Sequence, residues 1–328
     1  MGDKNNPTFN VIEHFNKYYI PIFLCLCLLS NSLSVYVLFF TKLRYNSSSV
    51  YLRALAMSDM AVLMTVLMMW FEWKNVINYE DWLHVLLFGL RFLFCFLSVW
   101  IVVTFTVIRY IAIKWPLLRR SLCTVNRAKI MMIGLVGLAV LYSIPWFIIE
   151  SATKKNFDAN VEKTNLTYWW RILIITNAII MLILPVTMIV MFNTLIICII
   201  RKQNCIRKNF ILSSVACNGN IRSSKDEISH IKATKMLVII SSIFICLNVP
   251  VHICSFILLD NMSGKYFSMI LFDMISSILY VTNYGINFIL YYATGETFRK
   301  EVIRIFTKCS DTKKDEYMEM EDYAKQYN

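Results

Sequence analysis

Three ionisable residues of this 328-residue chain stand inside long apolar stretches: Asp59, Arg91 and Arg109. A charged group in hydrocarbon costs about 2.5–3.5 kcal/mol on insertion scales, so it normally has both a partner and a function. A carboxylate with hydroxyl and amide neighbours suits a hard monovalent cation, and we expect a sodium ion at Asp59 and no other cofactor. The alternative is a hydrogen-bonded packing knot in which Asp59 is protonated or linked to water. The polar core that we predict comprises Asp59, Ser98, Asn283 and Asn287, with Asn31 at similar depth.

Arg91 and Arg109 are 18 residues apart, which in an α-helix is five whole turns and about 27 Å, so they share one face. Ser98 lies nearly between them, and we expect this helix at the centre of a bundle. Arg91 suits an anionic or acceptor group of a ligand; an internal salt bridge with Asp273, Glu72 or Glu150 is the alternative. The residues predicted to form a ligand pocket are Arg91, Cys95, His252, Asn248, Asp273, Glu72 and Tyr280.

Seven apolar segments are long enough to cross a membrane and would position these residues. Apolar residues make up 58% of the chain and charged residues 16%, against about 25% charged in soluble domains. A spanning helix needs roughly 20 mainly apolar residues. The segments are Tyr19–Phe40, Tyr51–Trp70, Val85–Ile113, Ile130–Ile149, Ile172–Ile200, Met236–Leu259 and Tyr266–Tyr292. The pieces between them are too short for a separate binding domain, so the composition predicts an all-α membrane protein, a seven-transmembrane helix bundle.

The basic residues fall mainly on one side of these segments. With the N-terminus outside, the expected outer segments hold 8 Lys and Arg and the inner ones 23. Basic residues in short loops stay cytoplasmic, so we predict a cytoplasmic C-terminus. We interpret the positive charge as a signal that sets the topology and contacts membrane lipids, and not as a nucleic-acid binding surface. The predicted divisions are an extracellular N-terminus (1–18), the membrane domain (19–292), an amphipathic membrane-surface helix (293–309) and a disordered cytoplasmic tail (310–328).

Three residues carry modification signals. Asn165 and Asn261 begin Asn-x-Ser/Thr sequences on the expected outer side and are predicted glycosylation acceptors. Cys309, at the end of the amphipathic helix, is a predicted palmitoylation site, with an unmodified thiol as the alternative. No cysteine falls in the expected outer loops and no Cys/His spacing suits a metal, so we expect neither a disulfide nor a metal site.

The motif content argues against catalysis. The chain has four histidines and lacks HExxH, GxSxG, GxGxxG and GxxxxGK[ST], so we expect no catalytic residues and no enzyme. A multi-pass transporter is a remote alternative, since charges inside the spans could mark a permeation path. The spans lack the paired Gly/Pro-broken segments that inverted-repeat transporters show.

Six motifs in order then give the chain a resemblance to the rhodopsin-like (class A) G-protein-coupled receptors over nearly its full length. They are Asn31, the LAxxD motif at Leu55–Asp59, Arg109-Tyr110 with Pro116-Leu117, Pro185, Phe244 with Pro250, and Asn287–Tyr291 followed by Phe298-Arg299. The sequence of Gly285–Tyr292 is similar to that of invertebrate neuropeptide receptors of the FMRFamide-receptor-like group. Some nematode-type chemoreceptors look much the same.

The resemblance implies a plasma-membrane receptor that converts the binding of an extracellular ligand, a short peptide by the charges expected at its rim, into activation of a heterotrimeric G protein. The residues that it assigns to G-protein coupling are Arg109, Tyr110, Pro116 and Tyr291. It assigns hinges to Pro185 and Pro250, for which simple packing is the alternative. A chemosensory receptor or a constitutively active one is the second interpretation.

Several positions depart from the family pattern. Ile108 replaces the aspartate before Arg109, and His230 replaces the acid that restrains this arginine from the sixth span, so we predict raised basal activity. Asn193 and Asn248 stand in place of the usual tyrosine and tryptophan.

Two further departures concern the outer side. The cysteine expected at the start of the third span is His84, and its partner loop, Ile149–Arg171, has no cysteine, so the family's disulfide is missing. We interpret His84 as an ordinary residue of the membrane interface. Arg91 replaces the acid of amine receptors and Val281 the retinal lysine of opsins, which excludes a monoamine ligand and a photoreceptor.

Overall fold

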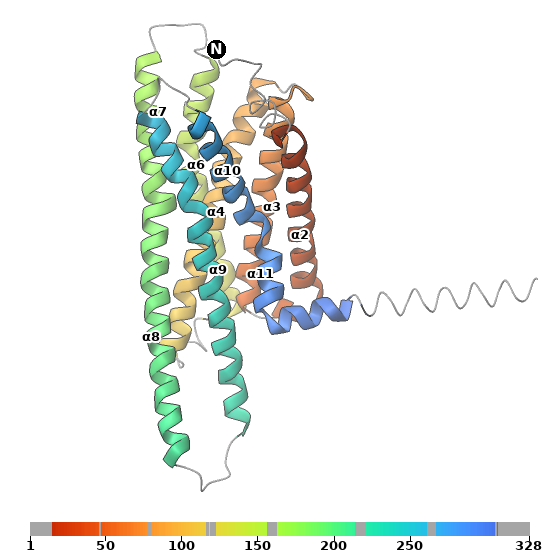
Figure 1. The fold of residues 1–328 in the computed structure, drawn as a ribbon, viewed down its shortest axis with the longest axis vertical. Helices are drawn as coiled ribbons and strands as arrows, with labels where there is room; N and C mark the ends of the chain where they lie inside the picture. Colours follow the sequence, from red (N-terminus) through yellow and green to blue (C-terminus); the bar gives the residue numbers. More distant parts are fainter. Residues whose placement is uncertain are drawn as a thin grey trace, which may run out of the picture.

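The computed structural model describes residues 15–45, 47–77, 80–115, 118, 123–155, 163–213, 221–260, 267–305 and 307. Among these residues all regular structure is helical (Figure 1). The elements are η1 (Phe15–Tyr19), α2 (Ile20–Phe40), η2 (Lys42–Tyr45), α3 (Ser47–Trp73), α4 (Asp81–Lys114), α6 (Val125–Lys155), α7 (Lys163–Ala178), η3 (Ile179–Ile183), α8 (Leu184–Ser213), α9 (Ile221–Asp260), α10 (Phe267–Gly285) and α11 (Asn287–Thr294), followed by a helix over 296–305.

The described part of the chain contains six helices that are long and apolar enough to cross a membrane, and a seventh span if α10 and α11 are counted together. The predicted helix bundle is confirmed. Several helices run beyond the predicted spans; α9, for example, begins at Ile221 and not at Met236. Hydrophobicity marks the stretch that lipid requires, whereas a helix continues through polar residues for as long as its backbone hydrogen bonds do.

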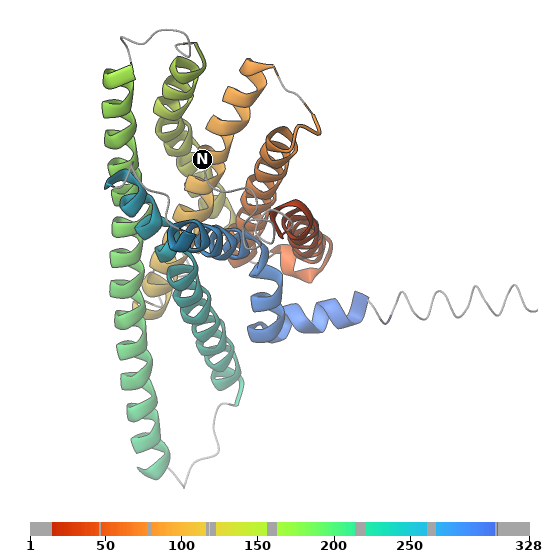
Figure 2. The ribbon, with the colours of Figure 1, turned by 45° about the horizontal axis from the view of Figure 1, so that its top comes forward.

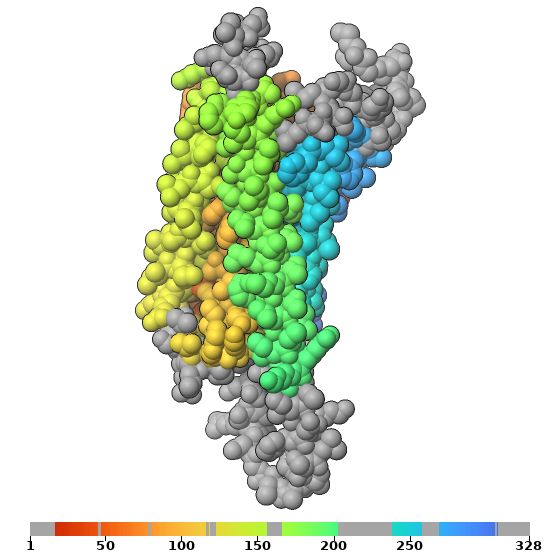
Figure 3. Space-filling view, turned by 90° about the vertical axis from the view of Figure 1, so that its left-hand side faces the viewer, coloured from red at the N-terminus to blue at the C-terminus, as the bar shows by residue number. Residues whose placement is uncertain are grey.

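Helix α4 lies at the centre of the bundle, as the spacing of its polar residues predicted. It packs against α3, α6 and α8, and Figure 3 shows it in the middle of the molecule only as a strip between α6 and α8. Valines and a phenylalanine of α4, among them Val99, Val103 and Phe96, are buried in the largest apolar cluster. We name the two ends of the bundle after residues near the ends of α4: the His84 end, where α4 begins, and the Arg109 end.

The last span is bent, where we predicted one continuous helix. The axes of α10 and α11 meet at 54° around Ile286, a turn that Figure 2 shows clearly. At this bend the Asn31 amide donates to the Tyr284 carbonyl at 2.6 Å, and the Ser30 hydroxyl donates to the Gly285 carbonyl at 3.2 Å. These carbonyls would serve the N–H groups of the next turn in a straight helix. Side chains of α2 therefore satisfy the backbone where the span breaks.

Glycine at 285 lets α10 approach α2 this closely. A Cβ atom built on Gly285 would lie 2.1 Å from the Cys27 Sγ and 2.7 Å from the Cys27 Cβ. Both distances are far below van der Waals contact, so any larger residue would force the two helices apart.

Pro185 and Pro250 occupy different positions in their helices. Pro185 is the second residue of α8 and follows the π-helical turn η3, in which the Leu184 N–H bonds the Ile179 carbonyl five residues back. Helices α7 and α8 form one long span through this turn. Pro250 lies inside α9, whose helix continues past it to Asp260. The assignment of hinges to Pro185 and Pro250 stays a prediction.

The helix over 296–305 leaves the bundle sideways after α11 (Figure 1). Its apolar face is seated on the bundle, because Phe298 and Val302 are buried in one cluster with Tyr291. Arg299 and Lys300 are exposed on the opposite side. This distribution is that of an amphipathic helix with its basic face toward solvent.

Candidate functional site

A buried carboxylate joins three helices in the middle of the bundle. Asp59 of α3 has no exposed surface. The Ser98 hydroxyl of α4 donates to one of its oxygens at 2.6 Å, and the Asn287 amide of α11 donates to the other. The structure thus brings together three of the four residues predicted for the polar core. Asn31, by contrast, uses its amide on the Tyr284 carbonyl.

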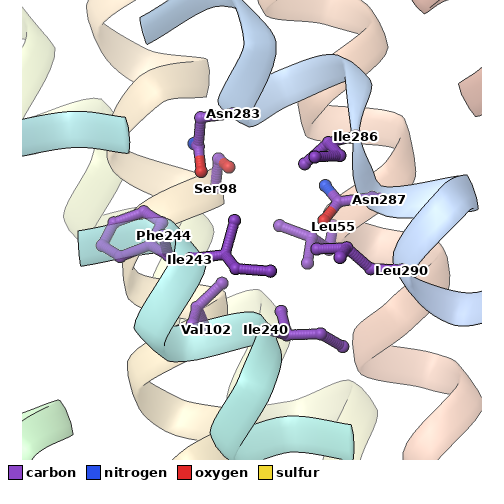
Figure 4. A pocket seen from close by; sticks show the side chains of 10 residues that line it. All are labelled: Leu55, Ser98, Val102, Ile240, Ile243, Phe244, Asn283, Ile286, Asn287 and Leu290. Atoms are coloured by element: carbon purple, nitrogen blue, oxygen red, sulfur yellow. The ribbon is translucent and has the colours of Figure 1, made fainter. Parts of the chain in front are cut away.

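A small cavity lies beside this cluster, toward the Arg109 end (Figure 4). Its volume, about 10 Å³, is about what one water molecule needs. The fourth predicted residue, Asn283, lines it close to Ser98 in Figure 4, whereas most of the remaining wall is apolar. The cavity is lined by Leu55, Ser98, Val102, Ile240, Ile243, Phe244, Asn283, Ile286, Asn287 and Leu290. Side chains of α9 therefore form one wall of this cavity, and on its polar side Ser98 and Asn287 are hydrogen-bonded to Asp59.

Two of the predicted pocket residues meet in the half of the bundle nearer the His84 end. The Tyr280 hydroxyl donates to the Cys95 Sγ at 3.1 Å, which joins α10 to the central helix. On α9, His252 and Asn248 are both buried. The Asn248 amide donates at 2.8 Å to the Phe244 carbonyl, one turn back in its own helix.

The acids expected to pair with Arg91 are bound elsewhere. Asp273 accepts a hydrogen bond from the Cys254 thiol at 3.5 Å, and Glu72 and Glu150 both contact His84. Arg91 is half-buried and, among the residues that the structure describes, forms no ion pair within 4 Å. The internal salt bridge that we considered for Arg91 is therefore not formed with any of the three.

His84, which we expected only to occupy the membrane interface, lies between two acids of neighbouring helices. Its Nδ1 is 2.5 Å from Glu72 Oε2 of α3, and its Nε2 is 3.2 Å from Glu150 Oε1 of α6. The exposed fractions of the three side chains are 17%, 21% and 10%. Sequence reasoning missed this cluster. Its signal was a histidine in place of the family's cysteine, with a glutamate at the matching end of each adjacent span.

Stacked aromatic rings lie directly below His84. Phe88 stacks on the imidazole with 6.5 Å between centroids. One turn further, the Phe92 and Trp146 rings stack face to face at 3.7 Å and 3°. Trp170 of α7 packs edge-on against Trp146. These contacts hold α4, α6 and α7 together beneath the histidine.

At the Arg109 end, the predicted coupling residues make specific contacts. The Arg109 guanidinium donates to the Ser48 hydroxyl of α3 and lies 4.9 Å from the centre of the Phe105 ring. Tyr110 packs on Phe192 of α8, with 5.2 Å between ring centroids. Tyr291 is fully buried and edge-on to Phe298. In the absence of an acid at position 108, a serine of α3 holds the arginine.

Helices α8 and α9 are joined by a buried polar contact near this end. The Asn193 amide donates to the Ser241 hydroxyl at 2.6 Å, and both side chains are at least nine-tenths buried. Asn193 is one of the departures from the family pattern, and the structure gives it a partner that the sequence did not reveal.

Five predicted residues are not placed. Pro116, Asn261 and Cys309 lie outside the described residues, as do the side chains of Asn165 and His230. Their assignments to G-protein coupling, glycosylation and palmitoylation stay predictions.

The described residues thus form a helical bundle of six spans, or seven with the bent pair, and a carboxylate, a hydroxyl and an amide meet at its centre. Residues 30–291 match the family model of the seven-transmembrane receptors of the rhodopsin family. The chain belongs to this family, and the predicted resemblance is confirmed. It is a multi-pass membrane protein of a receptor family.

The similar proteins include receptors from insects, primates and nematodes. The chain is 27% identical to the FMRFamide receptor of Drosophila melanogaster over 229 residues, which is 64% of this chain but only 37% of that receptor. It is 24% identical to the B1 bradykinin receptor of Macaca fascicularis over 298 residues, 86% of this chain and 80% of the relative. A probable G-protein coupled receptor of Caenorhabditis elegans is 22% identical over 88% of this chain and 68% of its own length.

Proposed function

We propose that this receptor binds a short extracellular peptide and activates a heterotrimeric G protein across the plasma membrane. Two of its relatives are named as receptors for FMRFamide and for bradykinin, which supports a peptide ligand. The excess of Lys and Arg in the loops at the Arg109 end supports a cytoplasmic location for that end. The His84 end then faces the outside, and the ligand approaches from there.

The proposal rests on one observation, that Arg91 has none of its expected acidic partners. A half-buried guanidinium in a membrane protein normally pairs with an acid, and the three acids expected near it are bound to other groups. With no acid of the described residues paired to it, Arg91 is available to a ligand's carboxylate or carbonyl group. Below it on α4, Cys95 already contacts Tyr280 of α10, so a group bound at Arg91 would press on the contact between α4 and α10.

The central cluster supports transmission from that site. Asp59 is bonded to α4 and α11 at once, so a shift of either helix changes a buried hydrogen bond. The adjoining cavity is walled by α9, the helix with the proline that we assign as a hinge. Movement of α9 about Pro250 would open the bundle at the Arg109 end, where Arg109 and Tyr110 would meet the G protein.

We also propose that sodium occupies the central cluster. One buried carboxylate balances one positive charge, and hydroxyl and amide oxygens of Ser98 and Asn283 complete an oxygen-rich set of the kind that hard cations prefer. Asp59, Ser98 and Asn283 would hold the ion. Bound there, sodium would stabilise the packing of α4 against the last span.

The test is a screen of short peptides against cells that express the receptor, with nucleotide exchange on G proteins in their membranes as the readout. We expect at least one peptide to stimulate exchange. In Arg91→Gln the concentration for half-maximal response should rise about 10- to 100-fold, as for loss of a hydrogen bond to a charged group. Arg171→Gln, which changes an exposed arginine of α7, is the matched control. Peptide-dependent solute uptake without nucleotide exchange would instead support a transporter.

A second candidate function is signalling without a ligand. It is favoured by one contact, because Arg109 donates to the neutral Ser48 hydroxyl of α3 and Ile108 replaces the acid that precedes this arginine in the family. Nucleotide exchange in the absence of any peptide measures this activity.

A further inference from the structure

His84 contacts a carboxylate through each of its two ring nitrogens. Nδ1 meets Glu72 at the end of α3, and Nε2 meets Glu150 near the end of α6. The two acids approach from opposite sides of the ring, and all three side chains are mostly buried. This one imidazole therefore links the ends of the neighbouring helices α3 and α4 to α6, whose Glu150 is 66 residues further along the chain.

The contacts require a proton. A neutral imidazole has one N–H donor and one acceptor nitrogen, and an ionised carboxylate can only accept. Two carboxylates can both be bonded only if the ring is an imidazolium, or if one acid carries a proton that it donates to the ring. In either case the cluster holds one proton more than a neutral histidine between two carboxylates.

We propose that His84, Glu72 and Glu150 form a proton-binding site that fastens the outer ends of α3, α4 and α6. With the proton bound, both ring nitrogens bind an acid. Without it, one carboxylate faces a nitrogen lone pair and two negative charges remain close together, so one contact is lost. The site occupies the place where the family's disulfide would begin, and it replaces a permanent link by one that depends on pH.

The geometry does not suit a metal ion. The two ring nitrogens point to different acids, so the three side chains cannot converge on one ion. Among the described residues there is no group of three His, Cys, Asp or Glu side chains placed to hold a metal. A proton, by contrast, needs only one nitrogen and one oxygen within hydrogen-bond distance, and each ring nitrogen has such a partner.

The other charged groups near His84 have partners of their own. Glu80, just ahead of α4, accepts a hydrogen bond from the Trp82 indole N–H at 2.7 Å. Lys154 of α6 pairs with Asp81 of α4 at 3.4 Å, in a contact where Asp81 is 76% exposed. Lys74, just beyond α3, lies 3.9 Å from the centre of the Trp73 ring. On α4 the next charged residue is Arg91, about two turns further on. None of these cations lies between Glu72 and Glu150, so the proton of the cluster is the positive charge that compensates them.

The direction of the pH effect follows from proton counting. The folded receptor holds a proton at this site, and unfolding separates the three side chains. Wherever the folded state binds more protons than the unfolded state, stability falls as the pH rises. As the pH rises the bound proton is lost, and with it one of the two contacts to the imidazole.

The experiment measures the unfolding temperature of the purified full-length receptor in detergent at pH values from 5.5 to 8.5. We expect the wild type to lose about 3–10 °C more than Glu72→Gln over this interval. A glutamine amide can donate to a neutral imidazole, so E72Q keeps the contact without the extra proton. Glu150→Gln should flatten the profile in the same way, and His84→Gln should remove this part of it.

Two controls make the comparison specific. Asp81→Asn removes an acid at the same end of the bundle, and His14→Gln removes a histidine that precedes the first span. Both should retain the wild-type pH profile. The proposal is overturned if E72Q and E150Q lose stability with pH as steeply as the wild type. Because these two variants decide the matter, the result does not depend on whether the His84 variant folds.

Discussion

Asn193 of α8 donates a 2.6 Å hydrogen bond to the Ser241 hydroxyl of α9, and both side chains are buried. These helices diverge toward the Arg109 end, as Figure 1 shows, so the bond lies where they are still in contact. The arginine restraint typical of the family lacks both of its acids in this chain. The bond between Asn193 and Ser241 is then a polar restraint between α8 and α9, the two helices that would separate if α9 moves as we propose.

Loss of this bond should raise basal signalling. We expect Asn193→Ala and Ser241→Ala each to increase ligand-independent nucleotide exchange about fivefold, the factor that corresponds to about 1 kcal/mol for one hydrogen bond. Thr194→Ala is the matched control, because the Thr194 hydroxyl is exposed and bonds only within its own helix. Equal basal exchange in all four proteins would show that the bond does not restrain α9.

An acid beside Arg109 should lower basal signalling. Arg109 now donates to the neutral Ser48 hydroxyl, whereas the carboxylate of Ile108→Asp would offer a stronger, charge-assisted partner. We expect about a tenfold reduction in ligand-independent nucleotide exchange. Ile108→Asn, of the same shape but uncharged, separates the charge from the loss of the isoleucine. If the Asp and Asn variants signal alike, the missing acid is not the cause of basal activity.

Sodium should stabilise the receptor through Asp59. We expect the unfolding temperature to be about 2–4 °C higher in sodium chloride than in choline chloride of equal concentration, with the difference lost in Asp59→Asn and reduced in Ser98→Ala. Thr106→Ala is the control, since this buried hydroxyl of α4 bonds only its own helix. A sodium effect that survives in Asp59→Asn would remove the ion from this cluster.

A methyl group at position 285 should destabilise the bundle. The Cβ of Gly285→Ala would lie 2.1 Å from the Cys27 Sγ, and overpacking of this kind corresponds to a loss of about 3–10 °C in unfolding temperature. Gly137→Ala is the matched control, because nothing lies within 4 Å of a Cβ atom there. Adding Cys27→Ala should restore part of the loss. An unchanged unfolding temperature in G285A would show that α2 and α10 are not in close contact.

The number of spans, the central place of α4 and three members of the polar core could all be predicted from the sequence. These features follow from two costs, that of burying charge and that of exposing apolar surface to water. Both can be judged from the residues of each segment alone. Asp59, for example, needs polar neighbours because an ionisable group in hydrocarbon is costly, and Ser98 offers a hydroxyl at similar depth. Their partner Asn287 was marked by a motif.

The bend at Ile286 and the His84 cluster could not be predicted in the same way. The bend depends on which carbonyls Ser30 and Asn31 reach, and that depends on the register between the first and last spans. The contact between His84 and Glu150 joins residues 66 positions apart. A single sequence records which polar groups are available but not the helix rotation that selects their partners.

The hydrogen bonds from α2 to the carbonyls of Tyr284 and Gly285 make the first span a mechanical partner of the last. If α10 moves, either α2 moves with it or the carbonyls of Tyr284 and Gly285 lose their hydrogen-bond donors inside the bundle. Helix α2, much of whose apolar surface is exposed on the outside of the bundle, is thereby coupled to α10. The thickness and composition of the bilayer around α2 then bear directly on how readily the seventh span can move.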